Sequence, residues 1–161
     1  MGYTHYYYRQ KELDKKKFQD FKDDVVKLHR SLPEHTNSAG GYHTHQRVII
    51  KGGDGTGSPH FSIDGICFNG DKEKDMYHET FNIPRVHMKE RVDENGLIFD
   101  FCKTARKPYD ILVCASLIAL KKHFGNDVKV SSDGDEEEWQ PAIDFFEEVL
   151  GKKAPKRLFS E

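Results

Sequence analysis

The sequence predicts an α+β domain in which a largely antiparallel or mixed sheet of about five to six strands packs with three helices. Segments of β-branched and aromatic residues with a two-residue alternation are clustered along the chain. Three other segments repeat apolar residues at spacings of three and four, which indicates helices. Clustered strands favour an antiparallel arrangement with helices on one side. No repeat or long linker divides the chain, so we expect one domain over residues 1–151 and a basic, frayed tail over 152–161.

The first two elements follow directly from residue periodicity. Residues 3–9 alternate as a strand, which places Tyr3, His5, Tyr7 and Arg9 on one face. Residues 14–32 predict an amphipathic helix that Pro33 ends. The core positions of this helix are Phe18, Phe21, Val25, Leu28 and Leu32.

The middle of the chain reads as short strands separated by turns. A loop over 34–42 precedes them, and the glycine-rich segment 52–59 follows the first strand. Pro84 indicates that the last of these strands ends there or lies at a sheet edge. The expected strands are 48–50, two within 60–68 around a turn at Asp64-Gly65, and 79–83.

The last third alternates strands and helices. Leu97 to Cys102 predicts a strand, and a helix follows from about Tyr109 to Phe124. This helix is apolar on nearly all sides, so we expect it to be central and buried. A short strand is expected over 128–130. A final helix follows Asp135, with its core positions at Trp139, Ile143, Phe146 and Leu150 before Gly151.

The composition argues against several classes of protein, although it leaves room for a local basic patch. Basic side chains number 25 against 27 acidic ones, whereas general nucleic-acid binders usually carry a basic excess. The longest apolar run, 111–120, is too short to span a bilayer, so no membrane partner is expected. The three cysteines form no disulfide or zinc-finger spacing, and no signal-peptide pattern opens the chain. We therefore expect buried free thiols and a cytoplasmic location, while the oligomeric state stays open.

The segment 102–110 is the strongest candidate site. It joins a strand to the buried helix, whose first N–H groups and positive dipole end favour an anion. Lys103, Arg106 and Lys107 add positive charge, and Thr104 lies among them. The alternatives are a solvated basic turn, basic residues paired with nearby aspartates, or an Asp110 carboxylate that caps the helix itself. We predict that this segment binds a small phosphorylated or otherwise anionic ligand.

The strand over 3–9 supplies the second half of the predicted site. Tyr3, His5, Tyr7 and Arg9 would form an aromatic wall suited to stacking on a base and holding a phosphate, provided that the strand lies beside the basic segment. The alternative is tyrosine-rich packing with hydroxyl groups in water.

Two further motifs are weaker. The loop Gly52 to Pro59 resembles a phosphate-binding glycine loop but lacks the following Lys and helix, so a tight connection between strands explains it more simply. His43 and His45 lie on one side of an extended segment and could chelate a metal, yet the sequence supplies no clear third ligand. We therefore predict neither a metal site nor a cofactor.

Two segments are distinctive: the opening Met-Gly-Tyr-Thr-His-Tyr and 101–110, Phe-Cys-Lys-Thr-Ala-Arg-Lys-Pro-Tyr-Asp. They resemble a family of small uncharacterised proteins encoded by tailed bacteriophages, and 101–110 is the most specific part of the resemblance. The resemblance implies a protein acting in the cytoplasm of a bacterial host, and it implies no mechanism. The remaining segments are 53–57, 68–70, 78–81 and 132–134.

Three functions are compatible with these observations. The leading hypothesis is a phage accessory protein that binds a small anionic or nucleotide-like ligand, such as a nucleotide-derived signal of host defence. The second is a phosphoester hydrolase that uses His5 or His78 as base, or a metal at His43 and His45. The third is an interaction module that blocks a host protein, which predicts an exposed apolar patch.

Overall fold

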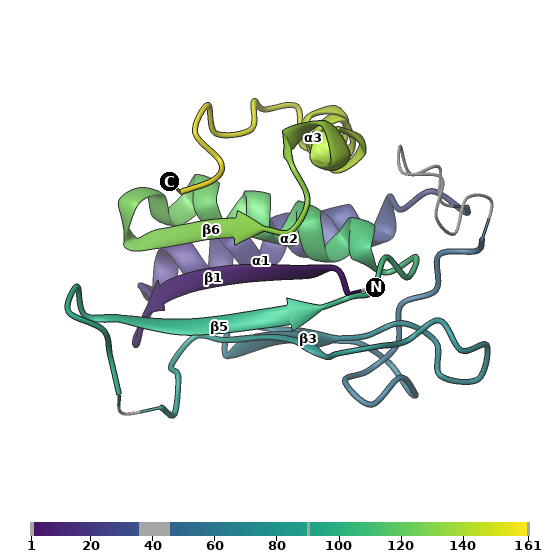
Figure 1. Ribbon diagram of the computed structural model, residues 1–161, viewed down its shortest axis with the longest axis horizontal. Helices are drawn as coiled ribbons and strands as arrows, with labels where there is room; N and C mark the ends of the chain where they lie inside the picture. The colour runs from purple at the N-terminus through teal and green to yellow at the C-terminus, as the bar shows by residue number, and fades with distance from the viewer. Residues whose placement is uncertain (1, 36–45, 90, 161) are drawn as a thin grey trace.

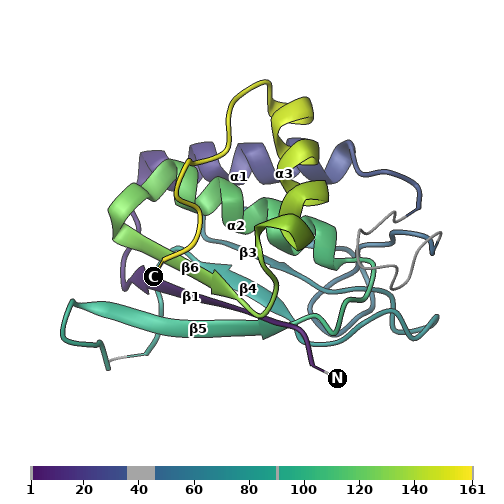
Figure 2. The same cartoon turned by 45° about the horizontal axis from the view of Figure 1, so that its top comes forward.

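The computed structural model describes residues 2–35, 46–89 and 91–160, and it confirms an α+β fold with three helices and six strands. The strands form two three-stranded antiparallel sheets, ordered β5-β1-β6 and β2-β3-β4. Figure 2 shows the helices gathered on one side of the molecule and the strands on the other. The elements are β1 (Thr4–Gln10), α1 (Lys15–Arg30), β2 (His60–Ser62), β3 (Gly65–Phe68), β4 (Phe81–Pro84), β5 (Leu97–Lys103), α2 (Asp110–Phe124), β6 (Val128–Ser132) and α3 (Glu136–Leu150).

The first sheet pairs the N-terminal strand with two strands from the second half of the sequence. β1 is its central strand and pairs with β5 and β6, so that His5 lies opposite both Cys102 and Ser132 (Figure 1). The even-numbered residues of β1 face outward, and Tyr3, His5, Tyr7 and Arg9 are all buried. The period-two prediction of a shared face is therefore correct, and that face packs into the core.

The expected single sheet is instead divided into two. The segment after β1 contacts the segment after β4 through an isolated bridge between Glu12 and Val86, and not through strand pairing. The predicted strand over 48–50 is also wrong, since only single bridges form at Arg47 and Lys51. A short apolar run forms a strand only when a partner strand is in register, and here the two bridges on either side of 48–50 go to different partners, His35 and Asn69.

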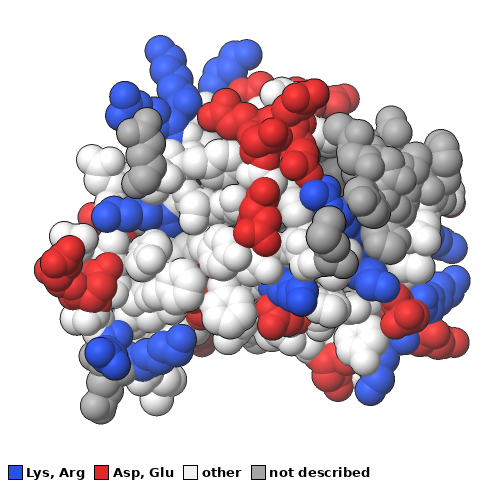
Figure 3. Space-filling view, viewed as in Figure 1, with Lys and Arg blue, Asp and Glu red and all other residues white. Residues whose placement is uncertain are grey.

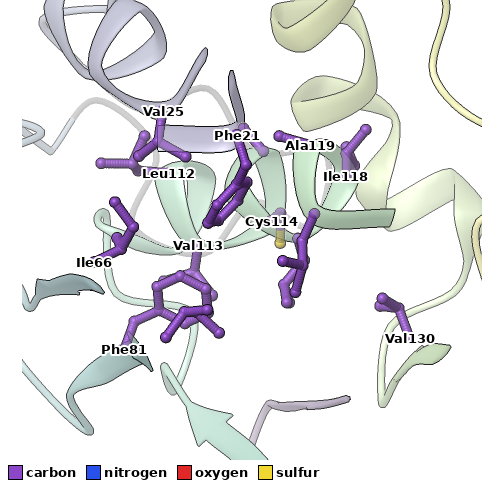
Figure 4. Packing of buried hydrophobic residues seen from close by; sticks show 14 of the residues in the cluster. Phe21, Val25, Ile66, Phe81, Leu112, Val113, Cys114, Ile118, Ala119 and Val130 are labelled. Atoms are coloured by element: carbon purple, nitrogen blue, oxygen red, sulfur yellow. The ribbon is translucent and has the colours of Figure 1, made fainter. Parts of the chain in front are cut away.

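Helix α2 is the centre of the core, as its apolar sequence predicts. It packs against α1, α3 and β6, and every residue from Leu112 to Leu120 is buried. Side chains from α1, β3, β4 and β6 surround it in Figure 4. Gly125 ends the helix at a φ of 54°, a conformation that glycine adopts without strain. No helix among the described residues has both the length and the apolar character needed to cross a membrane.

The segment after Gly151 packs back onto the first sheet. Leu158 is buried, and the ring of Phe159 lies edge-on to Trp139 at 5.0 Å between centroids. The N–H of Ser160 donates to the carbonyl of Val130 at 2.8 Å. The predicted basic tail thus lies along the outer edge of β6.

Candidate functional site

A buried histidine connects three elements at the end of the molecule where β1 and α2 begin. His5 has no exposed surface. Its Nε2 lies 2.6 Å from Oδ1 of Asp110 in the first turn of α2, and its Nδ1 lies 2.8 Å from Oγ of Ser132 at the end of β6. Burying an imidazole without partners is costly, so these two contacts explain why it can lie in the core.

The bonds to Ser132 indicate where the protons of this cluster lie. Its Oγ accepts from the N–H of Gly134 at 2.9 Å and from Nε1–H of Trp139 at 3.1 Å. A hydroxyl has two acceptor lone pairs and one proton, so the Ser132 hydroxyl donates to Nδ1 of His5. Nδ1 of His5 is then the ring nitrogen without a proton, so Nε2 carries the ring proton and donates a hydrogen bond to Asp110. The result is a directed chain from Ser132 through His5 to Asp110.

Asp110 is the negative end of that chain. Its carboxylate also accepts from the Thr104 hydroxyl and, at 3.4 Å, from the Cys114 thiol. Burial disfavours its charge, but the contacts with His5, Thr104 and Cys114 outweigh this and hold the pKa of Asp110 below its usual value. Burial and the nearby carboxylate raise the pKa of the Cys114 thiol well above its usual value. The cluster therefore combines an ionised carboxylate with a protonated thiol.

The same three side chains have the composition of a metal site. Ligand atoms of His5, Asp110 and Cys114 all lie within 4.8 Å of one another. A metal would need the lone pair of His5 Nε2, yet the bonding of Ser132 places a proton on that nitrogen. A metal here would have to displace that proton and the Cys114 thiol proton, since metal binding to such groups releases protons. The other suggested ligands, His43 and His45, lie outside the described residues.

Arg106 lies next to this cluster, and its guanidinium contacts both Tyr3 and Glu138. Its guanidinium carbon is 3.9 Å from the centroid of the Tyr3 ring, and Nη1 is 2.7 Å from Oε2 of Glu138 on α3. The Tyr3 ring in turn lies edge-on to His5 at 4.9 Å. Tyr3 therefore joins the arginine to the buried histidine.

The turn that carries Arg106 has an unusual backbone. Ala105 and Arg106 have φ angles of 52° and 61°, the left-handed region that non-glycine residues rarely adopt. The N–H groups of Thr104 and Ala105 both donate to the carbonyl of Tyr3, at 3.0 and 3.2 Å. Strained residues of this kind cluster at active sites, ligand-binding sites and switch regions.

The other two cations of the basic segment have different neighbours, and the end of the Lys103 side chain lies beside Gly2. Nζ of Lys107 donates to the carbonyl of Asp75 at 2.9 Å and lines a hollow with His78 and Glu79. Lys103 lies on β5 opposite Thr4, and its backbone N–H donates to Glu79. The three cations do not converge on one point, and the carboxylate of Asp110 already lies at the start of α2.

The remaining predicted residues, Tyr7 and Arg9, lie deeper along β1. Tyr7 packs against Phe81 in the core. The guanidinium of Arg9 donates to four backbone carbonyl groups, and burial lowers its pKa to about 10. These two side chains hold the sheets together and do not extend the wall formed by Tyr3 and His5. The four acceptors of Arg9 are the carbonyls of Gln10, Lys11, Pro84 and Arg85.

The glycine-rich loop is closed by hydrogen bonds within itself. The N–H of Gly52 donates to the carbonyls of Thr56 and Gly57, and the Asp54 carboxylate accepts from Thr56. Gly55 has a φ of 85° and touches Lys72, as a tight connection requires. The loop is therefore built as a turn between β-bridges.

Several site residues were not predicted as such. Ser132, Cys114, Trp139 and Glu138 complete the surroundings of His5 and Arg106. The four-residue spacing of Asp110 and Cys114 on an otherwise apolar helix was a readable signal, because residues at this spacing share one face. Ser132 and Glu138 carried no comparable signal.

Comparisons with known proteins give no relative for this chain. No protein-family model, no curated protein and no solved structure matches the chain.

Proposed function

We propose that the protein binds a small anionic ligand, phosphorylated or nucleotide-like, at the turn that carries Arg106. One observation supports this most directly: the guanidinium lies over the Tyr3 ring and against Glu138, and the backbone that positions it is strained. A guanidinium that is already oriented loses less entropy when it binds phosphate through two parallel hydrogen bonds. Its side chain is 29% exposed, so a ligand can reach it.

Glu138 would compete with such a ligand. Its carboxylate is bound to the same guanidinium, so an incoming phosphate has to displace or share that contact. Glu138→Gln removes the competing charge without changing the side-chain shape. Because the ion pair no longer has to be broken, we expect this variant to bind the ligand several-fold more tightly.

Isothermal titration against a panel of mono-, di- and cyclic nucleotides tests the proposal. We expect Arg106→Ala to abolish binding and Arg106→Lys to weaken it about tenfold or more, since lysine cannot bind phosphate through a fork. Arg30→Ala, on the exposed side of α1, is the matched control. Equal binding by the wild type and an Arg106→Ala/Lys107→Ala double variant would remove this site.

The resemblance to phage proteins extends the proposal to a biological role. A ligand derived from nucleotides and used as a signal in host defence would be sequestered in the bacterial cytoplasm. Mass spectrometry of small molecules released from the protein after purification from an infected host would identify it.

A phosphoester hydrolase is a second candidate, and the chain from Ser132 through His5 to Asp110 favours it. His5 Nδ1 is placed to take the Ser132 proton as Oγ attacks phosphorus; the P–O bond to the ester alcohol would break, the alcohol would leave with that proton, and water would then hydrolyse the phosphoserine. Hydrolysis of bis-p-nitrophenyl phosphate by the wild type, lost in Ser132→Ala and kept in Ser131→Ala, would support it. Equal rates in all three proteins would exclude it.

A further inference from the structure

The outward face of the first sheet carries four aromatic side chains, which we call the aromatic face: Tyr6, Tyr8, Phe99 and Phe101. Antiparallel pairing places Tyr6 opposite Phe101 and Tyr8 opposite Phe99. The two phenylalanines are 48% and 41% exposed, for Phe101 and Phe99 respectively. Figure 3, which views this side, shows few charged side chains over the middle of the face.

The rings form one connected group. Tyr6 and Phe99 are nearly parallel, at 17° with centroids 6.2 Å apart, and Tyr8 lies 5.1 Å from Phe99. Phe101 continues the row at 6.0 Å. Burying rings of this kind would stabilise the fold, so leaving them exposed on a central sheet indicates a surface that binds something.

Positive charge lies beside one end of the aromatic face. Lys129 stands opposite Tyr8 on β6, and both line a hollow that also contains Ser160 and one acidic residue, Asp93. At the other end of the face the Tyr6 hydroxyl donates to the Asp133 carboxylate at 3.0 Å, so phosphates are expected only on the Lys129 side. Ser160 lines a second hollow as well, of about 620 Å³, and the two hollows therefore adjoin. The second hollow has a single acidic lining residue, Glu136, against four cations: Lys121, Lys122, Lys156 and Arg157.

The free edge of β5 disfavours a protein partner that would add a strand. The N–H of Phe101 is bound by the Asp100 carboxylate at 2.9 Å, and that of Lys103 by Glu79 at 2.7 Å. Side chains thus occupy donors that an added strand would need. An apolar protein partner would also offer no negative charge to the cations that line the second hollow.

We infer that the aromatic face binds single-stranded nucleic acid, with bases stacked on the rings and phosphates directed past Lys129 toward the basic hollow. Every base has a π face, so such stacking requires no sequence match. The whole chain has a net charge of −2, which confines the attraction for phosphate to this local patch. The inference is independent of the Arg106 site.

Fluorescence anisotropy with short fluorescein-labelled oligouridylate and oligothymidylate tests it at low salt. We expect the wild type to bind one or both, with affinity falling steeply as salt rises, and a duplex of the same length to compete poorly. Phe99→Ala/Phe101→Ala should weaken binding about tenfold or more. Lys129→Glu should weaken it mainly at low salt. Ile63→Ala, 59% exposed in the turn between β2 and β3, should bind like the wild type.

Three outcomes would overturn the inference. The first is the absence of an anisotropy change with either strand at low salt. The second is equal binding by the wild type and the double phenylalanine variant, with circular dichroism showing both folded. The third is light scattering that finds a wild-type dimer and a monomeric double variant without oligonucleotide binding, which would make the face a self-association surface. Arg106→Ala should leave the affinity unchanged, which separates this surface from the proposed ligand site.

Discussion

His5 on β1 and Asp110 in the first turn of α2 are joined by a 2.6 Å contact between Nε2 and Oδ1, across 105 residues of sequence. The contact ties the central strand of the first sheet to the central helix of the core. The Asp110 side chain is 22% exposed while His5 is fully buried, so the pair lies at the boundary between core and solvent.

Asp110→Asn should destabilise the protein by about 2–4 kcal/mol. The carboxylate accepts from His5, Thr104 and Cys114, and an amide presents its NH2 group to at least one of these donors. Urea unfolding measures the change. Asp144→Asn, an exposed side chain on α3, should stay within about 0.5 kcal/mol of the wild type. Similar losses in both variants would contradict this account.

The same substitution should change how stability depends on pH. The pKa of Asp110 in the folded state lies below the ordinary value of 3.8, so the unfolded chain binds more protons between the two values. Its contribution is therefore complete above pH ~3.8 and is lost as pH falls through the folded pKa. Asp110→Asn should unfold less steeply with acid over that window. The pKa of Asp24 is lowered too, through His123 and Lys152 against its burial, and should supply part of the remaining slope.

Gly134→Ala tests the contact between the β6–α3 loop and Tyr3. A Cβ at this position would lie 2.2 Å from the Tyr3 hydroxyl, so the ring that supports Arg106 has to move. We expect a loss of about 1–3 kcal/mol. Adding Tyr3→Phe should recover part of that loss in a double-mutant cycle, because the closest atom is gone. If the two losses simply add, the clash is relieved in some other way.

Arg9→Lys and Arg9→Met should each cost about 2–4 kcal/mol, despite keeping a long side chain. The guanidinium donates to four carbonyl groups that lie in different directions, which three ammonium protons cannot reproduce. Thermal and urea unfolding would measure both variants against Arg30→Lys as control. A wild-type midpoint for Arg9→Lys would show that charge alone is needed.

The thiols should differ sharply in reactivity. Cys102 and Cys114 are buried and their pKa values are strongly raised by burial, whereas Cys67 is partly exposed. Only Cys67 should react with Ellman's reagent in the native protein, and slowly, because burial raises its pKa as well. All three should react in urea. Cys67→Ser should abolish the native reaction, and reaction of a second thiol before unfolding would contradict the described burial.

Residue periodicity alone determined the α+β fold class, the three helices and the two-residue alternation of β1, whereas the tertiary structure decided which face of β1 is buried. α1, α2 and α3 begin and end within a few residues of the predicted bounds, because caps and apolar spacing are local properties. Strand pairing is not local. The run 48–50 finds no partner strand, and the expected sheet is divided in two, since register depends on residues far away in sequence.

The candidate site divides in the same way. The sequence predicted site residues in the strand 3–9 and in the segment 102–110. The tertiary structure brings four of them, Tyr3, His5, Thr104 and Arg106, together around Asp110. Only that structure decided that Lys103 and Lys107 point away, that Tyr7 and Arg9 belong to the core, and that Ser132 and Glu138 complete the site. The physical reason is that the direction of a side chain in a turn, and its neighbours across a sheet, depend on pairings and backbone angles that no short stretch of sequence specifies.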